Sequence, residues 1–499
     1  MKFLRSFQQP VPIDSAGEAT SKPMGGRRAV VVYGGLSLLL LVPCFWQPRL
    51  EAGDLSSHIY NAWLVQLIEA GRLQGLTVAT QTTNLLFDLI LSGLYRILGA
   101  EMAQRISVSI AVLVFVWGAF AFVSKVSGRR PWHLLVCIAM LAYGWVFHMG
   151  FFNFYLSLGL CFWAMALVWE DGRRWKWALP ILALAYVAHG LPVVWTGCLL
   201  LYLWLARHIP ARRHAWLTLG ALTVMVGAHW MLDRHLVTRW TPLQVVSTTG
   251  LDQVWVFDMK YYYVLIGLLV VWGLMFLDLV HTAGPRKVAA SLPFQICIMS
   301  ALGVFIMPST VAIPGFQHSL VYIAERMSLG VGICVCALLG MAQARAVVRY
   351  GLAVVAILFF GFLFRDERAL NSFEDRMQDT VAHLKPGTRV LSGVEDNGIR
   401  VFALTHMIDR ACLGRCFSYA NYEASTAQFR VRAMSENPYV AFRYRDSYQM
   451  QQGKYVVQAG DLPMYKVDLE NGRLVIRTLE AGNPCGIKYW NVLADAPRS

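Results

Sequence analysis

The feature of this sequence that most constrains its fold is a series of separate apolar runs, each about 15 to 22 residues long, which is the length that a helix needs to cross a bilayer. Short clusters of Lys and Arg divide these runs. Hydrophobic residues make up 57% of the chain and charged residues 15%, whereas a soluble protein carries roughly a quarter charged residues. The chain is therefore predicted to be a polytopic α-helical membrane protein.

The apolar runs predict eleven transmembrane helices, near residues 29–47, 106–124, 132–147, 150–169, 176–190, 191–206, 215–231, 261–281, 291–307, 327–341 and 350–364. Basic clusters in the loops between alternate spans mark the cytoplasmic side of a membrane protein. They account for the net charge of +14, so we expect no nucleic acid partner. An odd number of spans from a cytoplasmic N-terminus places the C-terminus outside. We expect a multi-pass protein of the bacterial inner membrane.

Composition divides the chain into three regions. Residues 1–28 are polar and rich in Pro, Gly and Ser, and we expect a disordered cytoplasmic tail there. Residues 29–364 form the predicted membrane domain, with an outer loop at residues 48–105. The chain turns polar at Arg365, and residues 365–499 are expected to form a soluble, periplasmic α/β domain.

Local patterns within residues 365–499 support that expectation. The segment RDERALNSFEDRMQDTVAHL has the pattern of a polar amphipathic helix, and KPGTRVLSG predicts a turn followed by a strand. The segments KYVVQAG, MYKVDLENGRLVIRTL and YWNVLA alternate as strands do. Asn471-Gly472 predicts a hairpin turn between two of the strands.

Residues 82–99, TTNLLFDLILSGLYRILG, suggest a twelfth span. This segment is short and carries Asp88 and Arg96, and counting it as a span would place the later Arg clusters outside. We therefore interpret it as an interfacial or re-entrant helix on the outer face.

Three of the ten cysteines, Cys412, Cys416 and Cys485, lie in the polar C-terminal region, where an oxidising compartment permits a disulfide. Cys412 and Cys416 are separated by three residues including Gly414, so this pair is slightly favoured, and Cys485 is the competing partner.

Asp54 lies at the N-terminal edge of a helix-like segment, just after the first apolar run. Leu55, Ile59, Trp63, Leu67 and Ile68 follow with helical spacing, so one side of this helix is expected to lie against the membrane. Asp is a favoured helix cap, and capping alone explains an acid at this position. A carboxylate at the membrane–water boundary, four residues before His58, can also act as a general base on a hydroxyl acceptor.

The order of these parts resembles the GT-C glycosyltransferase superfamily, which includes the protein O-mannosyltransferases and the lipid A aminoarabinose transferases. The resemblance rests on the first outer loop with Asp54 near its start, a helix ending in AGRL, the helix NLLFDLILSGLYRILG, and the following span AEMAQRISVSIAVLVFVWGAF. It implies a GT-C-like fold and a glycosyltransferase that moves a sugar from a polyprenyl-phosphate donor to a lipid, glycan or protein acceptor. It further implies that Asp54 is the essential acid of the first outer loop.

Such a reaction needs cationic groups near the donor phosphate. Arg326 is the strongest candidate, in the outer-loop segment GFQHSLVYIAERMSLG that also carries His318 and Glu325. Its guanidinium can bind a phosphate with two hydrogen bonds, or it can anchor at the interface or pair with Glu325. Lys260, before three tyrosines, is a second candidate, although an aromatic interfacial belt also explains it.

The remaining candidate site residues are polar groups near the outer ends of spans. His148, Asn153 and His189 fall at such positions, where polar side chains often line a cavity. Together with Asp54, the histidines 58, 148, 189 and 318 could bind a divalent metal such as Mg²⁺ or Mn²⁺, although their spacing matches no established ligand set and no cofactor is certain. In the C-terminal region, a dense polar–aromatic group suits either sugar binding or an ordinary folded surface: Asp409, Arg410, Tyr419, Tyr422 and Arg430.

Two other functions stay open from the sequence. A transporter or lipid-glycan flippase is expected to have repeated halves and charges deep in several spans, and the sequence has neither. A non-catalytic envelope assembly protein would use the C-terminal domain to bind a partner and would leave Asp54 as a simple helix cap.

Overall fold

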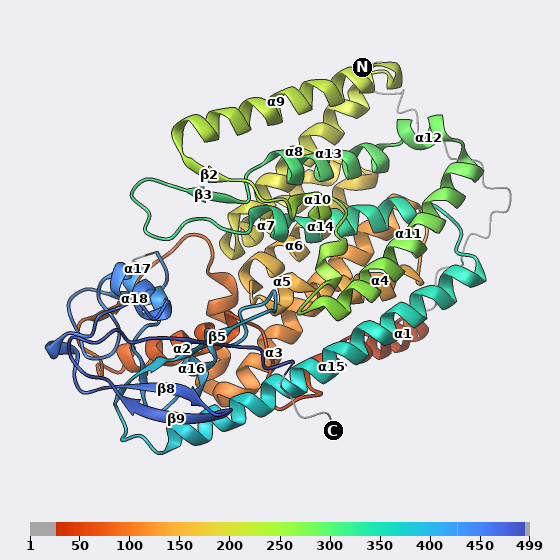
Figure 1. Cartoon of the computed structure of the whole chain (residues 1–499). Coiled ribbons are helices and arrows are strands. Elements are labelled where there is room, and N and C mark those ends of the chain that lie inside the picture. Colours follow the sequence, from red (N-terminus) through yellow and green to blue (C-terminus); the bar gives the residue numbers. More distant parts are fainter. Residues whose placement is uncertain (1–25, 427, 495–499) are drawn as a thin grey trace.

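The computed structural model describes residues 26–426 and 428–494, so nearly all of the predicted cytoplasmic tail lies outside the described residues. Figure 1 shows a bundle of helices with a smaller, strand-containing region packed at one end. Each apolar run that predicted a span is helical. These helices are α1 (Gly26–Leu40), α3 (Leu86–Ser127), α4 (Leu134–Ala142), α5 (Trp145–His148), α6 (Phe152–Glu170), α7 (Trp175–Ala188), α8 (Gly190–His208), α9 (His214–His235), α11 (Tyr262–Ala283), α13 (Leu292–Ile306), α14 (Ile323–Leu339) and α15 (Ala346–Ala382).

In the described part of the chain, six helical segments are long and apolar enough to cross a membrane. They are Leu86–Ser127, Phe152–Glu170, Gly190–His208, Ala211–His235, Met259–Ala283 and Ala346–Ala382. The segments Leu134–His148 and Leu292–Ile306 are apolar but shorter. These features are those of a helical membrane protein, and the count of eleven spans stays a prediction.

The predicted interfacial segment at residues 82–99 is helical from Leu86 and runs directly into the following span. The two parts of α3 are separated by a break at Gly99, whose φ of 74° and ψ of 176° are far from helical values. Glycine adopts a positive φ without the steric cost that a side chain would add. Gly99 therefore marks the boundary between the loop helix and the apolar helix that follows it.

Helix α2 (Leu55–Glu69) is buried within the protein, so the expectation that its apolar side lies against the membrane is wrong. Leu55 and Ile59 are fully buried. The Trp63 ring stacks on Phe417 of the C-terminal region with 5.7 Å between centroids. Helical spacing defines an apolar face but does not identify what covers it, and here the cover is protein.

Helix α15 passes through the predicted boundary at residue 365 without interruption (Figure 1). Its polar half buries one stripe of side chains, Asp366, Glu367, Asn371 and Glu374, at helical spacing. These buried side chains form hydrogen bonds with groups elsewhere in the protein. For example, the Asn371 amide donates to the carbonyl of Arg49 at 3.1 Å. The predicted amphipathic helix is thus the rigid continuation of the last apolar helix.

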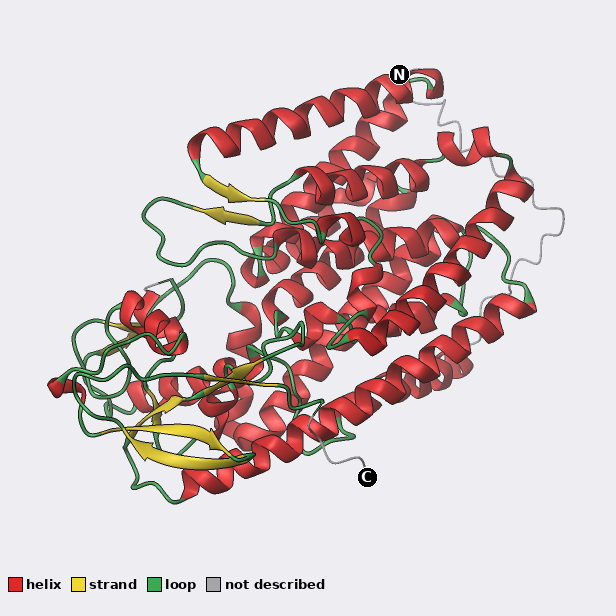
Figure 2. Cartoon of the chain, in the orientation of Figure 1, coloured by secondary structure: helices red, strands yellow, loops and turns green. Residues whose placement is uncertain are grey.

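The C-terminal region contains a small mixed sheet with the strand order β6-β4-β8-β9 (Figure 2). Strand β4 (Arg389–Ser392) pairs in parallel with β6 (Phe417–Ser418) and β8 (Met464–Glu470), and β8 pairs antiparallel with β9 (Arg473–Thr478). The last two strands form the predicted hairpin, with φ values of 49° at Asn471 and 76° at Gly472.

The segment KYVVQAG was expected to be a strand but forms only an isolated bridge at Val456. Its partner is the single residue Pro484, which cannot donate a backbone hydrogen bond to extend a ladder. The segment YWNVLA begins within β10 (Lys488–Trp490), which pairs in parallel with β5 (Val394–Asp396).

Pairing between distant segments joins the outer loop to the C-terminal region. Strand β1 (Leu76–Val78) of the outer loop pairs antiparallel with β7 (Val431–Ala433). A second pair, β2 (Val237–Arg239) and β3 (Thr310–Ala312), joins two other loops.

The short α-helices are α10 (Gln244–Ser247), α12 (Pro285–Ala290), α16 (Met407–Ala411), α17 (Tyr422–Thr426) and α18 (Tyr444–Gln451). The 3-10 helices are η1 (Val42–Cys44), η2 (Gly172–Arg174), η3 (Ala211–Arg213), η4 (Leu251–Val254), η5 (Met259–Tyr261) and η6 (Ala459–Asp461).

Candidate functional site

The backbone around Asp54 is fixed against the turn between α5 and α6. The Asp54 N–H donates to the carbonyl of Met149 at 3.0 Å, and the Gly53 N–H donates to the carbonyl of His148 at 2.8 Å. Gly150 has a φ of 82°, and a Cβ there would lie 2.6 Å from the Asp54 nitrogen. Only glycine allows the backbone at position 150 to lie this close to the backbone of Asp54. This close contact holds the start of α2 in place.

The Asp54 side chain does not cap α2. Asp54 occupies the cap position, yet its carboxylate accepts no hydrogen bond from the first turn of the helix. A cap stabilises a helix through that hydrogen bond, so capping does not account for this acid. The side chain is 26% exposed, and within residues 26–426 and 428–494 its ionic contact is with His406, at 3.8 Å between Oδ1 and Nε2.

His406 reaches Asp54 from the C-terminal region and is itself held by an acid. Its Nδ1 lies 2.9 Å from Oδ2 of Asp409, and the Asn421 amide donates to the same oxygen at 3.2 Å. Burial opposes a charge on His406, but the hydrogen bond to Asp409 and the charges of Asp409 and Asp54 raise its pKa to about 9. A positively charged imidazole therefore faces the Asp54 carboxylate. Our sequence reasoning singled out Asp409 but missed His406, three residues earlier in the chain.

Arg326, in the first turn of α14, lies over the Phe151 ring with 3.7 Å from Cζ to the ring centroid, a close cation–π contact. Among the described residues no salt bridge joins its guanidinium, and the buried Nε has no hydrogen-bond partner. Glu325 points elsewhere, because it accepts a hydrogen bond from the Ser309 hydroxyl at 2.5 Å. The charges of Arg326 and Asp54 attract each other across the site. A partly desolvated guanidinium with unused donors is suited to an anion.

Aromatic side chains surround these charges. Tyr322 precedes α14 with a φ of 58°, a strained backbone for a residue other than glycine, and its ring lies 6.1 Å from that of Phe151. Burial raises the pKa of Tyr322 to about 12, and Glu325 and Asp54 act in the same direction. His318 stacks on Tyr422 with 5.3 Å between centroids.

The pKa values of these aromatic neighbours show that both charges reach them. Burial lowers the pKa of His318, while Asp54 raises it and Arg326 lowers it. Burial also raises the pKa of Tyr422, with a further rise from Asp54 and an opposing effect from Arg326. Asp54, His318 and Arg326, three of the predicted site residues, are therefore brought together, with Tyr322, Tyr422 and His406 added by the fold.

His58 and Asn153 hold the half-buried carboxylate of Asp88 beside this site. His58 Nδ1 lies 2.7 Å from Oδ1 of Asp88, and the Asn153 amide donates to the other Asp88 oxygen at 2.7 Å. Asn153 also accepts a hydrogen bond from the Phe87 N–H at 2.8 Å. Burial opposes a charge on His58, but Asp88 raises its pKa to about 10. These contacts tie α2, α3 and α6 together, so His58 and Asn153 have structural partners.

Three other predicted site residues have their polar atoms occupied by the scaffold. Both ring nitrogens of His148 are 3.1 Å from acceptors, the Gly144 carbonyl and a Glu367 oxygen. His189 Nδ1 accepts the Leu191 N–H at 3.2 Å and so caps α8. Lys260 Nζ lies 2.7 Å from Asp366 and 2.9 Å from Asp258. His148 is fully buried and Lys260 is half-buried between two carboxylates, so these partners account for them without a substrate.

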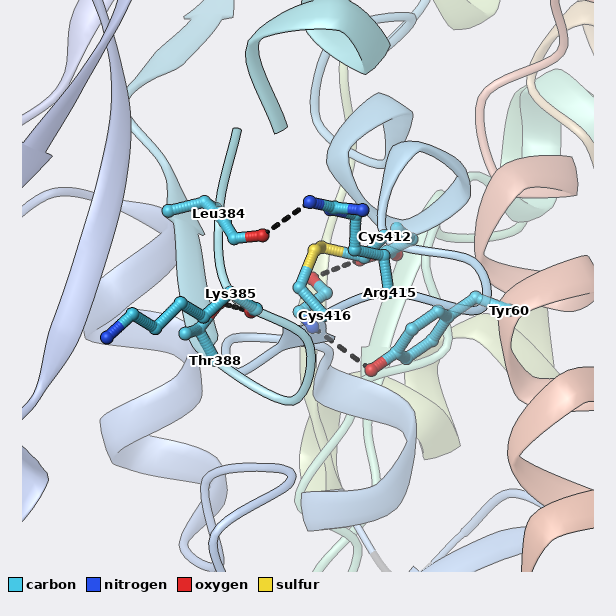
Figure 3. Close-up of a disulfide and its surroundings, with 9 residues drawn as sticks. Tyr60, Leu384, Lys385, Thr388, Cys412, Arg415 and Cys416 are labelled. Atoms are coloured by element: carbon cyan, nitrogen blue, oxygen red, sulfur yellow. Dashed lines mark hydrogen bonds between the residues drawn. A yellow bond between two sulfur atoms is a disulfide. The ribbon is translucent and has the colours of Figure 1, made fainter. Parts of the chain in front are cut away.

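A disulfide joins Cys412 and Cys416 with 4.7 Å between their Cα atoms, and it is the favoured pair; Cys485 is free and buried (Figure 3). The Arg415 guanidinium donates to the Leu384 carbonyl at 2.7 Å, and the Tyr60 hydroxyl of α2 accepts from the backbone N–H of Ser418 at 3.0 Å. These contacts fix the segment that carries His406 and Asp409 against α2.

The polar–aromatic group predicted in the C-terminal region does not form one cluster. Asp409 and Tyr422 lie at the site, whereas Arg430 donates to the Ser92 hydroxyl of α3 at 2.7 Å. The Tyr419 ring lies under the Arg389 guanidinium, with 5.3 Å from Cζ to the centroid. In the part of the chain that the structure describes, no three His, Cys, Asp or Glu side chains are grouped so that they could hold a metal ion.

No protein-family profile matches the chain, and comparisons with the curated proteins and with the solved structures found no significant match.

Proposed function

We propose that this protein is a membrane glycosyltransferase of GT-C type that moves a sugar from a polyprenyl-phosphate donor to a hydroxyl acceptor. The observation that carries the proposal is the pairing of an Asp54 carboxylate that caps nothing with an Arg326 guanidinium that has no ion-pair partner in the described residues. In most proteins an acid at this position caps its helix, and a buried arginine forms an ion pair. Here both stay available and their charges interact.

The chemistry assigns one role to each group. Asp54 accepts the proton of the acceptor hydroxyl as its oxygen bonds to the anomeric carbon of the sugar. The bond from that carbon to the phosphate oxygen breaks, and polyprenyl phosphate leaves with the bonding electron pair. Arg326 stabilises the charge that grows on the phosphate. The aromatic rings of Tyr322 and Tyr422 offer apolar faces for a sugar ring.

The membrane setting supports a lipid-linked donor. Two apolar helices, α6 and α14, begin next to Phe151 and Arg326, and a polyprenyl chain dissolves in the bilayer that such helices would cross. We propose that transfer occurs on the outer face of a bacterial inner membrane, with the C-terminal region in the periplasm and a lipid, glycan or protein as the acceptor. Transfer measured with and without EDTA tests whether the reaction needs a divalent cation such as Mg²⁺ or Mn²⁺.

The decisive experiment measures sugar transfer from a panel of radiolabelled polyprenyl-phosphate sugars by the purified protein in lipid nanodiscs. Asp54→Asn keeps the shape of the side chain and removes the base, so transfer is expected to fall by about 10²–10⁴-fold. The matched control is Glu436→Gln, which removes one exposed negative charge in the C-terminal region and is expected to transfer like the parent. Full transfer by a folded Asp54→Asn variant would rule out the proposed role of this acid.

A further inference from the structure

The structure places a second carboxylate–imidazole pair directly behind Asp54. His406 lies between two acids, with Nδ1 at 2.9 Å from Asp409 and Nε2 at 3.8 Å from Asp54. Because Asp409 accepts the proton on Nδ1, the ring orientation is set and Nε2 is the atom that faces Asp54. The gap of 3.8 Å is too long for a direct hydrogen bond and short enough for an ion pair.

From this arrangement we propose that His406, oriented by Asp409, is a positioning residue whose imidazole holds the Asp54 carboxylate toward the acceptor. This inference rests on the proposed function and adds that the C-terminal region completes the acid–base apparatus of the first outer loop. Nothing in the spacing of the sequence links His406 to Asp54.

Asp409 is held firmly enough to orient a histidine. The Ser418 hydroxyl donates to one of its oxygens, and the Asn421 amide donates to the other at 3.2 Å. The same Asn421 amide donates to the Ser57 hydroxyl at 3.1 Å, in the first turn of the helix that begins after Asp54. One amide therefore ties the His406–Asp409 pair to α2, and both halves of the apparatus keep a fixed relation.

The charges around His406 come from several elements. Asp54 lies before α2, Asp409 in α16, Glu423 in α17 and Glu395 in β5, and each interacts with the imidazole. This acidic surrounding explains why the buried ring carries a positive charge, with a pKa of about 9. A fixed cation next to Asp54 attracts its carboxylate and so limits where that carboxylate can point.

The test compares pH–rate profiles of sugar transfer for the parent, His406→Gln and Asp409→Asn, all in nanodiscs. In the parent, kcat should fall as the pH rises through about 9, where the His406 imidazolium loses its proton, and the profile of His406→Gln should lack this alkaline limb. The donor KM should change less than twofold, since Arg326 is intact. Asp409→Asn should move the alkaline limb to lower pH, because Asp409 raises the pKa of His406. His383→Gln, an exposed histidine of the same region, should leave the profile unchanged.

A structural role for His406 would lower kcat equally at every pH, and an unchanged alkaline limb in a folded variant therefore overturns the inference. If His406→Gln does not fold, Asp409→Asn carries the same test with a smaller change of shape. Loss of transfer in Asp54→Asn together with a parent-like profile in the His406 variant would refute this inference alone. Full transfer in Asp54→Asn would instead refute the proposed function.

Discussion

Arg410 of the C-terminal region donates through Nη2 to the Glu51 carboxylate of the first outer loop at 3.1 Å, and both side chains are buried. The same guanidinium contacts Glu374 of α15, the Leu50 carbonyl at 2.9 Å and the Gln104 amide oxygen at 3.1 Å. Burial raises the pKa of Glu51, and so does Glu374, while Arg410 lowers it. One buried cation thus joins the segment before Asp54 to the region that supplies His406.

Replacing Arg410 with Met should destabilise the protein by about 3–5 kcal/mol, because Glu51 and Glu374 would be left buried without their cation. Thermal unfolding in detergent, with limited proteolysis of the C-terminal region, measures this loss. The control is Arg368→Met, at an exposed position of α15, which should unfold like the parent. Parent-like stability of the Arg410 variant would show that the ion pairs do not hold the two regions together.

Arg326→Gln should weaken binding of the donor and should also slow transfer, since Arg326 is proposed to stabilise the charge that grows on the leaving phosphate. Hydrogen bonds to charged groups contribute about 1.5–3 kcal/mol, so the KM for the polyprenyl-phosphate sugar should rise by roughly 10- to 150-fold. Steady-state kinetics with the donor varied tests this, and Arg72→Gln, at an exposed position of the outer loop, is the control. An unchanged donor KM would leave Arg326 with only its packing on Phe151.

Glu423→Gln should stabilise the protein at alkaline pH and leave it unchanged at acid pH. Burial raises the pKa of Glu423, His58 lowers it and Asp88 raises it. Together these influences set the pKa at about 7. A raised pKa in the folded state means that the stability contributed by the protonated acid is complete below pH 4.5 and is lost as the pH rises through 7. Gln cannot ionise, and its Oε1 can still accept the hydrogen bond from Ser57.

Unfolding temperatures at pH 4 and pH 8.5 measure this difference. The variant should gain about 3 kcal/mol over the parent at pH 8.5, since the pKa rises from 4.5 to about 7 and one pKa unit corresponds to about 1.4 kcal/mol. Glu436→Gln, which is exposed, should show no such dependence on pH. An equal difference between variant and parent at both pH values would contradict the assignment of a raised pKa to Glu423.

The predicted topology places residues 72 and 435 outside the cytoplasm and residue 212 inside, because basic loops face the cytoplasm. Single cysteines at these exposed positions, in a variant that keeps the Cys412–Cys416 disulfide and lacks the free thiols, report their side through a membrane-impermeant maleimide on intact cells. Labelling is expected at positions 72 and 435 only. Position 212 should react only after the cells are permeabilised. Labelling of position 212 in intact cells would contradict the predicted orientation.

Local chemistry in the sequence determined a large part of this protein. The apolar runs became helices because a long apolar segment satisfies its own backbone hydrogen bonds in that form. Asn471-Gly472 formed the hairpin turn since its two residues accept positive φ. Cys412 and Cys416 paired across one short turn. Each of these outcomes depends on residues close together in the chain.

The tertiary structure alone decided what covers each face and which charges meet. The segment KYVVQAG alternates like a strand, but among the described residues it forms only an isolated bridge with Pro484. Helix α2 has the spacing of a membrane-surface helix, yet Phe417 of the C-terminal region packs on it. His406 meets Asp54, while Glu325 accepts a hydrogen bond from Ser309, and in the described part of the chain Arg326 has no ion-pair partner. Periodicity specifies the direction of a side chain, whereas its partner depends on how distant segments pack, and packing is a property of the whole chain.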